Sequence, residues 1–172
     1  MASPEDFFRM LEVSPEKGIL ILHGVRHVML SVQSFAALCT TLIQGFGAGM
    51  RAVLYDAGFR TGHDFVGYSA RRFGVERLEE VLQHIIDGDA LEGWGRYEVV
   101  SVDRQQRRVV IRVYNSIAAR AFPQSEQPAC DFLRGYFAGI FTAIFDQPVR
   151  CEEMQCMALG NPFCEFCIEP EQ

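Results

Sequence analysis

Five of the six cysteines in this chain lie after residue 129, with acidic side chains among them. Zn²⁺ is held in proteins by four tetrahedral ligands drawn from thiolate, imidazole and carboxylate groups. In a chain without an export signal, clustered cysteines more often bind a metal or do redox chemistry than form disulfides. The alternative is a set of buried thiols that pack as small apolar side chains. The thiols in question are Cys130, Cys151, Cys156, Cys164 and Cys167.

A hairpin near the C-terminus would bring several of these groups together. Cys156 and Cys164 flank a Leu-Gly-Asn-Pro turn, so they can approach one another. Glu153 could join them if its strand bends, and Cys130 could close the site from the start of a helix. Cys167 has the familiar two-residue spacing from Cys164, but a strand would place the two thiols on opposite faces. Spacing alone does not choose among these groups.

The apolar segment 130–145 mixes large rings with small residues. Such a helix either packs tightly against a neighbour or borders a cavity. The residues alone favour plain core packing. The rings are Phe132, Tyr136, Phe137, Phe141 and Phe145, and the small residues are Gly135, Ala138, Gly139 and Ala143.

Helical and strand patterns must position these groups. Apolar spacing predicts a short helix through residues 10–11, a long helical stretch from residue 34 that glycines divide near 45–49 and Gly74 ends, and helices at 75–86 and 130–145. Strand pairs are predicted at 17–22 with 26–32, 94–103 with 107–114, and 149–156 with 163–168, and a helical turn at 115–121. Grouped strands and helices indicate an α+β fold with antiparallel strands and packed helices.

Composition sets the class of protein. A chain of 172 residues with 49% hydrophobic residues suits one globular domain, residues 1–172. A net charge of −6 argues against direct nucleic-acid binding. No apolar run is long enough to span a bilayer, and the acidic N-terminus is unlike a signal peptide, so a cytoplasmic protein is expected. The Gly45-Phe-Gly47-Ala-Gly49 segment lacks the dinucleotide fingerprint, and no nucleophile elbow is visible.

The C-terminal motifs resemble the 4-vinyl reductase domain family, which includes sensor domains of phenol- and toluene-responsive bacterial transcription activators. The resemblance is carried by Cys130 to Gly139, Glu153 to Cys156, Gly160, and Cys164 to Phe166, and it extends to residues 24–32, 57–62 and 91–93. It covers about residues 18–168. In those sensors zinc is held by Cys, Glu, Cys and Cys at spacings that this chain repeats. The resemblance therefore implies Cys130, Glu153, Cys156 and Cys164 as ligands of a closed, structural zinc site.

The resemblance also implies a fold and a ligand. The fold is the one shared with Golgi transport-particle subunits and nitric-oxide-sensing haem domains. A small hydrophobic or aromatic ligand would sit beside the aromatic helix, in a pocket whose expected lining is Phe59, Trp94, Phe132, Tyr136 and Gly139.

This chain departs from the phenol sensors at the groups that bind the ligand hydroxyl. Phenol-sensing members use a histidine and a tryptophan, where this chain has Asp89 and Arg112. A buried Arg112 would need an anionic partner, either Asp89 or a ligand carboxylate. The alternative is that Arg112 is a solvated strand residue. A different or more polar ligand is therefore expected, or none.

Three functions remain open from the sequence. The leading one is a zinc-containing sensor or carrier domain that binds a small hydrophobic molecule, forms a homodimer, and signals through a partner. A second is an enzyme or accessory factor in tetrapyrrole metabolism, and haem binding by one of the four histidines is less favoured. A third is an interaction module without a ligand. An enzyme is the less favoured class, because no hydride-donor site is visible.

Overall fold

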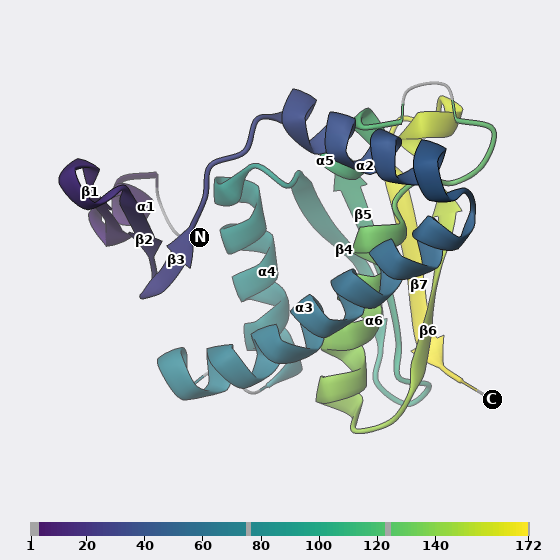
Figure 1. Ribbon diagram of the computed structural model, residues 1–172. Coiled ribbons are helices and arrows are strands. Elements are labelled where there is room, and N and C mark those ends of the chain that lie inside the picture. Colours follow the sequence, from purple (N-terminus) through teal and green to yellow (C-terminus); the bar gives the residue numbers. More distant parts are fainter. Residues whose placement is uncertain (1–3, 75–76, 123–124, 172) are drawn as a thin grey trace.

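The computed structural model describes residues 4–74, 77–122 and 125–171. Two sheets and several helices make up the fold (Figure 1). The helices are α1 (Pro4–Met10), α2 (Val32–Phe46), α3 (Gly49–Phe73), α4 (Leu78–Glu92), α5 (Ile117–Arg120) and α6 (Asp131–Phe145), with short 3₁₀ turns η1 (Pro15–Lys17) and η2 (Met157–Leu159). The strands are β1 (Leu11–Ser14), β2 (Ile19–Leu22), β3 (Val25–His27), β4 (Arg96–Asp103), β5 (Arg108–Tyr114), β6 (Val149–Gln155) and β7 (Cys164–Pro170).

The larger sheet is fully antiparallel and has the strand order β4-β5-β7-β6. Apolar and polar residues alternate along β5, so one face of the sheet is buried and the other faces outward. Helix α6 packs on the buried face and supplies most of the core opposite the strands. The largest fully buried side chains of this core include Phe137, Phe141, Leu133 and Ile140 from α6, and Phe166, Ile111 and Ile168 from the strands.

Helix α3 crosses α6 at backbone contact distance, and glycines make this possible. A Cβ atom added to Gly139 would lie 2.0 Å from the carbonyl oxygen of Phe59, and one added to Gly62 would lie 2.0 Å from that of Tyr136. Gly58 and Gly135 are equally close to the partner helix. The glycines of α6 therefore serve helix packing.

The N-terminal sheet β1-β2-β3 lies beside the helical body, and an extended stretch joins it to α2 (Figure 1). His23 and Gly24 both have positive φ, as the tight turn between β2 and β3 requires. The Tyr68 hydroxyl donates to the carbonyl oxygen of His23, which ties this sheet to α3.

The elements largely match the sequence prediction, with differences at the N-terminal end. Strand β1 was not predicted, and the predicted strand 26–32 is only β3, because residues 28–31 pair with no strand among the described residues. The predicted helix 75–86 begins at Leu78 and continues to Glu92; residues 75 and 76 lie outside the described part. Gly74, in a left-handed conformation, ends α3 as predicted.

Candidate functional site

Three thiols and one carboxylate converge where α6 begins beside the last hairpin. Cys130 is the N-cap residue of α6, Glu153 lies on β6, Cys156 follows that strand, and Cys164 opens β7. Their ligand atoms all lie within 4.8 Å of one another, and the three thiols are buried. The structure thus brings together the four residues that the family resemblance implies.

The geometry and chemistry of this cluster fit a tetrahedral metal. The Cys130 and Cys164 sulfurs are 3.5 Å apart, close to the separation of about 3.8 Å that two thiolates have across a tetrahedral Zn²⁺ with bonds of about 2.3 Å. One oxygen of Glu153 accepts a hydrogen bond from the Cys130 amide at 3.0 Å. The other oxygen is buried and has no hydrogen-bond partner in the part of the chain that the structure describes, as expected for an atom that a cation would satisfy.

The electrostatics of the cluster show how tightly the four acidic groups are packed. Hydrogen bonds from Cys130 and Cys164 lower the pKa of the Cys156 thiol to about 2, while the hydrogen bond with Cys156 and burial raise the pKa of Cys130. Burial and the nearby Cys156 raise the pKa of Glu153 to about 8. Several anionic ligands at such distances are stable together when a cation lies between them.

Two other cysteines of this region are outside the cluster. Cys167 pairs with Val110 and lies three residues after Cys164, on the opposite face of β7, as the strand geometry predicts. Cys151 is buried on β6, where burial raises the pKa of its thiol.

A row of aromatic rings runs along the face of α6 that looks toward α4. Trp94 stacks on Phe132, with ring centroids 5.5 Å apart and planes at 9°, and Phe35 of α2 meets Trp94 edge-on at 6.0 Å. One turn further along α6, Tyr136 meets Phe65 of α3 at 6.1 Å. Because positions four apart share one helix face, Phe132 and Tyr136 present a continuous aromatic surface.

A buried carboxyl contacts this row at Tyr136. Asp89 of α4 is 8% exposed, and its Oδ1 accepts a long hydrogen bond of 3.4 Å from the Tyr136 hydroxyl. Its Oδ2 and the hydroxyl of Tyr97, which is 4% exposed, have no hydrogen-bond partner among the described residues. Burial, and then the charge of Glu92, raise the pKa of Asp89 to about 8.

Three residues that the sequence analysis placed in the pocket make their contacts elsewhere. Arg112 points from the outward side of β5, where its Nε donates to Glu165 at 2.7 Å and its guanidinium lies over the Phe163 ring. Arg112 therefore fits the alternative given in the sequence analysis, a strand residue on the outer face of the sheet, and its ion-pair partner is Glu165 and not Asp89. Gly139 meets the α3 backbone, and the Phe59 ring stacks on His63.

Two other aromatic residues of this region, Tyr97 and Phe65, were not singled out from the sequence. Tyr97 occupies an inward position in the alternation of β4, which is the signal that could have identified it. Phe65 lies on the face of α3 that carries Gly58 and Gly62. It contacts His84 of α4 at 5.7 Å, and burial lowers the pKa of that histidine.

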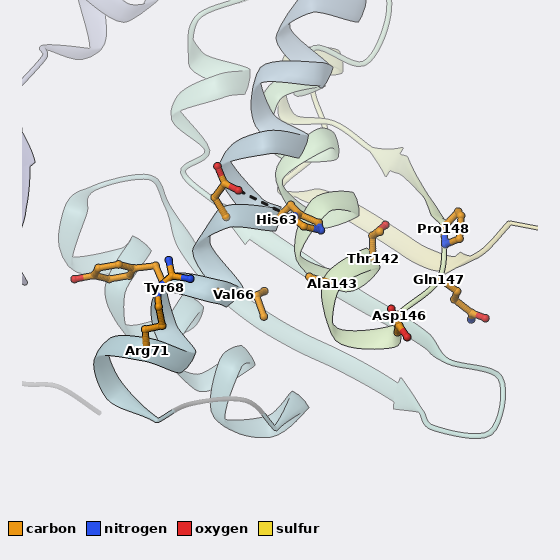
Figure 2. Close-up of a pocket in the computed structure, with 11 residues that line it drawn as sticks. His63, Val66, Tyr68, Arg71, Thr142, Ala143, Asp146, Gln147 and Pro148 are labelled. Atoms are coloured by element: carbon orange, nitrogen blue, oxygen red, sulfur yellow. Dashed lines mark ion pairs between the residues drawn. The ribbon is translucent and has the colours of Figure 1, made fainter.

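Two surface hollows lie apart from the Asp89 carboxyl. The larger, about 980 Å³, lies between the second half of α3 and the end of α6; Figure 2 shows His63, Arg71 and Asp146 on its walls. The smaller, about 420 Å³, is lined by residues that include Arg51, Asp131 and Arg134. Neither hollow is lined by Trp94, Phe132, Tyr136 or Asp89.

Solved structures with the same fold include sensor and trafficking proteins. The phenol-responsive sensory domain of the transcription activator PoxR superposes with a TM-score of 0.84 at 19% identity, covering 97% of this chain and 88% of that one. A trafficking protein particle complex subunit 3 from Naegleria fowleri, covalently bound to palmitic acid, gives 0.60 at 14% identity, covering 82% and 93%. An H-NOX protein from S. oneidensis gives 0.54 at 16% identity, covering 86% and 80%. These likenesses confirm the fold that the resemblance implied.

Sequence comparisons divide the chain into two matched parts. The uncharacterized protein MJ1642 of Methanocaldococcus jannaschii is 35% identical over 72 residues, which is 42% of each protein, so the match spans less than half of that relative. The 4-vinyl reductase domain matches residues 109–170, which contain the four clustered ligands. The family described as "Activator of aromatic catabolism" matches residues 6–105, which contain Asp89, Trp94 and Tyr97. The chain therefore belongs to the activator of aromatic catabolism family and carries a 4-vinyl reductase domain in its C-terminal part.

Proposed function

We propose that this chain is a metal-containing sensor or carrier domain that binds one small aromatic molecule between α4 and α6. The observation that carries the proposal is the aromatic row around Asp89, with two buried polar atoms that have no partner among the described residues. A ring-shaped ligand with a polar substituent would satisfy both the aromatic faces and these atoms. Membership of a family described by aromatic catabolism supports the same class of ligand.

Ligand binding is tested by the fluorescence of Trp94. This residue is the only tryptophan of the chain and stacks directly on Phe132, so its emission reports on this site alone. We expect saturable quenching or a spectral shift when single-ring aromatic compounds are added. Loss of that response in Tyr136→Leu, with an unchanged circular dichroism spectrum, would support the site. A wild-type protein that responds to none of these compounds would contradict the proposal.

We further propose that Zn²⁺ occupies the cluster of Cys130, Glu153, Cys156 and Cys164 as a structural ion. The set has four protein ligands, which suits a closed site without an open catalytic position. The ion would join the start of α6 to the last hairpin, so it would stabilise the fold without taking part in a reaction. Metal analysis and thiol alkylation of the purified protein test this, since unprotected, freely alkylated Cys130 and Cys156 would contradict it.

A homodimer is the proposed assembly, formed through the exposed apolar stretch between β3 and α2. Val28 and Met29 are each 84% exposed, and Leu30 is 53% exposed. On α2, Leu38 and Phe46 are also exposed. Contiguous exposed apolar side chains of this kind mark interaction surfaces. Because the stretch lies between the small sheet and the body, a second copy would hold the two parts of each chain together (Figure 1). Any signal would then pass through the dimer or a partner protein.

We propose that residues 1–172 form one such domain, with a core of about 18–168. None of the helices in the described residues is long and apolar enough to span a membrane. Native mass spectrometry of the purified chain would measure bound metal, subunit number and any retained small molecule together. Retained haem would instead support the haem-sensor alternative.

A further inference from the structure

Among the described residues, the groups that act most strongly on the Asp89 carboxyl are acidic or neutral, and the imidazole of His27 acts on the adjacent Glu92. The groups that act on the pKa of its carboxyl, besides burial, are Glu92 on the same helix, Tyr136 on α6 and Tyr97 on β4. None of them carries a positive charge. His84 lies five residues earlier on α4, and burial lowers its pKa, which disfavours the charged form of the imidazole. Arg112, which the sequence offered as a basic partner, is paired with Glu165 on the outward side of the sheet.

The aromatic side chains near this carboxyl suit a cation. Tyr136 reaches Asp89 directly, and Trp94 follows that residue just beyond the end of α4. Aromatic rings attract ammonium groups through their negative faces, most strongly when water is excluded. A carboxyl group among aromatic side chains is the combination that proteins use to bind organic ammonium ions.

The unpartnered atoms favour the same ligand. Within the described residues, neither Asp89 Oδ2 nor the Tyr97 hydroxyl makes a hydrogen bond of normal geometry, although the two groups lie close enough for the hydroxyl to act on the carboxyl. An ammonium group supplies three N–H donors and no acceptor, so one can reach Oδ2 while the others face the Tyr97 oxygen and the rings. A carboxylate ligand would meet Asp89 as a like charge, with no basic side chain among the groups that act on it.

We propose that, within the binding function put forward above, this site selects an aromatic ligand that carries a cationic amine, with the ammonium group bound to Asp89. This differs from recognition of a phenol hydroxyl. The ligand ring would lie among Trp94, Phe132 and Tyr136, and Asp89 would be the residue that determines specificity.

The test compares four single-ring probes at pH 7 by Trp94 fluorescence: benzylamine, toluene, phenol and benzoate. We expect benzylamine to bind at least about tenfold more tightly than toluene or phenol, and benzoate to bind most weakly. Because the ammonium group needs an ionised Asp89 and the pKa of that carboxyl is about 8, benzylamine affinity should rise about tenfold from pH 6 to pH 7. Toluene affinity should not change over the same range.

Asp89→Asn removes the charge and keeps the shape. We expect it to weaken benzylamine binding about 100-fold or more, since it removes one partner of a buried ion pair, and to leave toluene within about threefold. Asp56→Asn is the matched control, because the Asp56 carboxylate is exposed on α3 and pairs with Arg60 at the surface. It should leave all four affinities unchanged.

The outcomes separate this inference from the binding function itself. If toluene or phenol binds as tightly as benzylamine, or Asp89→Asn binds benzylamine as well as wild type, the amine specificity is wrong and aromatic binding stands. If none of the four probes changes Trp94 fluorescence, both proposals are wrong.

Discussion

Replacing Asp89 by asparagine should change how the stability of the protein depends on pH. The carboxyl has an ordinary pKa of 3.8, and burial raises the pKa to about 8 in the folded protein. Between these values the folded state holds a proton that the unfolded chain has lost. Stability contributed by this group is therefore fully present below pH 4 and is lost as the pH rises to about 8.

The size of the effect follows from these two pKa values. At about 1.4 kcal/mol per pH unit, the penalty relative to a neutral side chain is about 3 kcal/mol at pH 6 and about 5 kcal/mol at pH 8. Asp89→Asn does not titrate, so its advantage over wild type should grow by about 2 kcal/mol across this range. The difference in unfolding free energy between Asp89→Asn and wild type at any one pH depends on how the asparagine amide is hydrogen-bonded. The change of that difference with pH does not.

Urea unfolding at pH 6, 7 and 8, followed by circular dichroism, measures this difference. The range does not go below pH 6, so that protonation of the proposed metal ligands does not add to the difference between the two proteins. The exposed control Asp56→Asn should follow the wild-type profile. Unfolding free energies of wild type and Asp89→Asn that change in parallel with pH would refute the account, because they would mean that Asp89 is hydrated or paired in the folded protein.

The remaining predictions concern the metal cluster, the helix crossing and the dimer. Cys156→Ser should lose bound zinc and lower the melting temperature, measured by metal analysis and calorimetry, whereas Cys167→Ala should keep the zinc; equal zinc in both variants would exclude Cys156 as a ligand. Gly139→Ala should cost about 1–3 kcal/mol or more in urea unfolding because its Cβ meets the α3 backbone. Gly88→Ala, where a Cβ meets nothing within 4 Å, should instead stabilise α4 by up to about 1 kcal/mol. If both substitutions changed the unfolding free energy by the same amount, the close crossing of α3 and α6 at Gly139 would be contradicted. Met29→Glu should convert a dimer to a monomer in light scattering, and an unchanged mass would exclude this surface.

The closeness of the four residues proposed to bind a metal was the part of the candidate site that the sequence and the family resemblance anticipated best. Spacing placed Cys156 and Cys164 on either side of one turn, and family resemblance added Cys130 and Glu153 from elsewhere. The structure brings all four within 4.8 Å. The sequence by itself could not select these four residues. Tertiary packing decides which face of the last hairpin lies against the start of α6.

The ligand site was only partly predictable, for reasons visible in particular residues. The alternation of β5 buries Val109, Ile111 and Val113 and turns Arg112 outward, but the sequence analysis left open whether Arg112 was a pocket residue or a solvated strand residue. By contrast, the role of Gly139 depends on a partner helix distant in sequence, and no local pattern distinguishes a helix crossing from a cavity wall. The short strand β1 likewise exists only because β2 pairs with it.

The most direct test of the central claim is an NMR measurement of contacts between a bound ring and the protein. With benzylamine added to the metal-loaded protein, the account predicts nuclear Overhauser effects from the ligand ring protons to the Trp94 indole and the Tyr136 ring. Contacts confined to the surface hollow lined by His63 and Arg71 would contradict it.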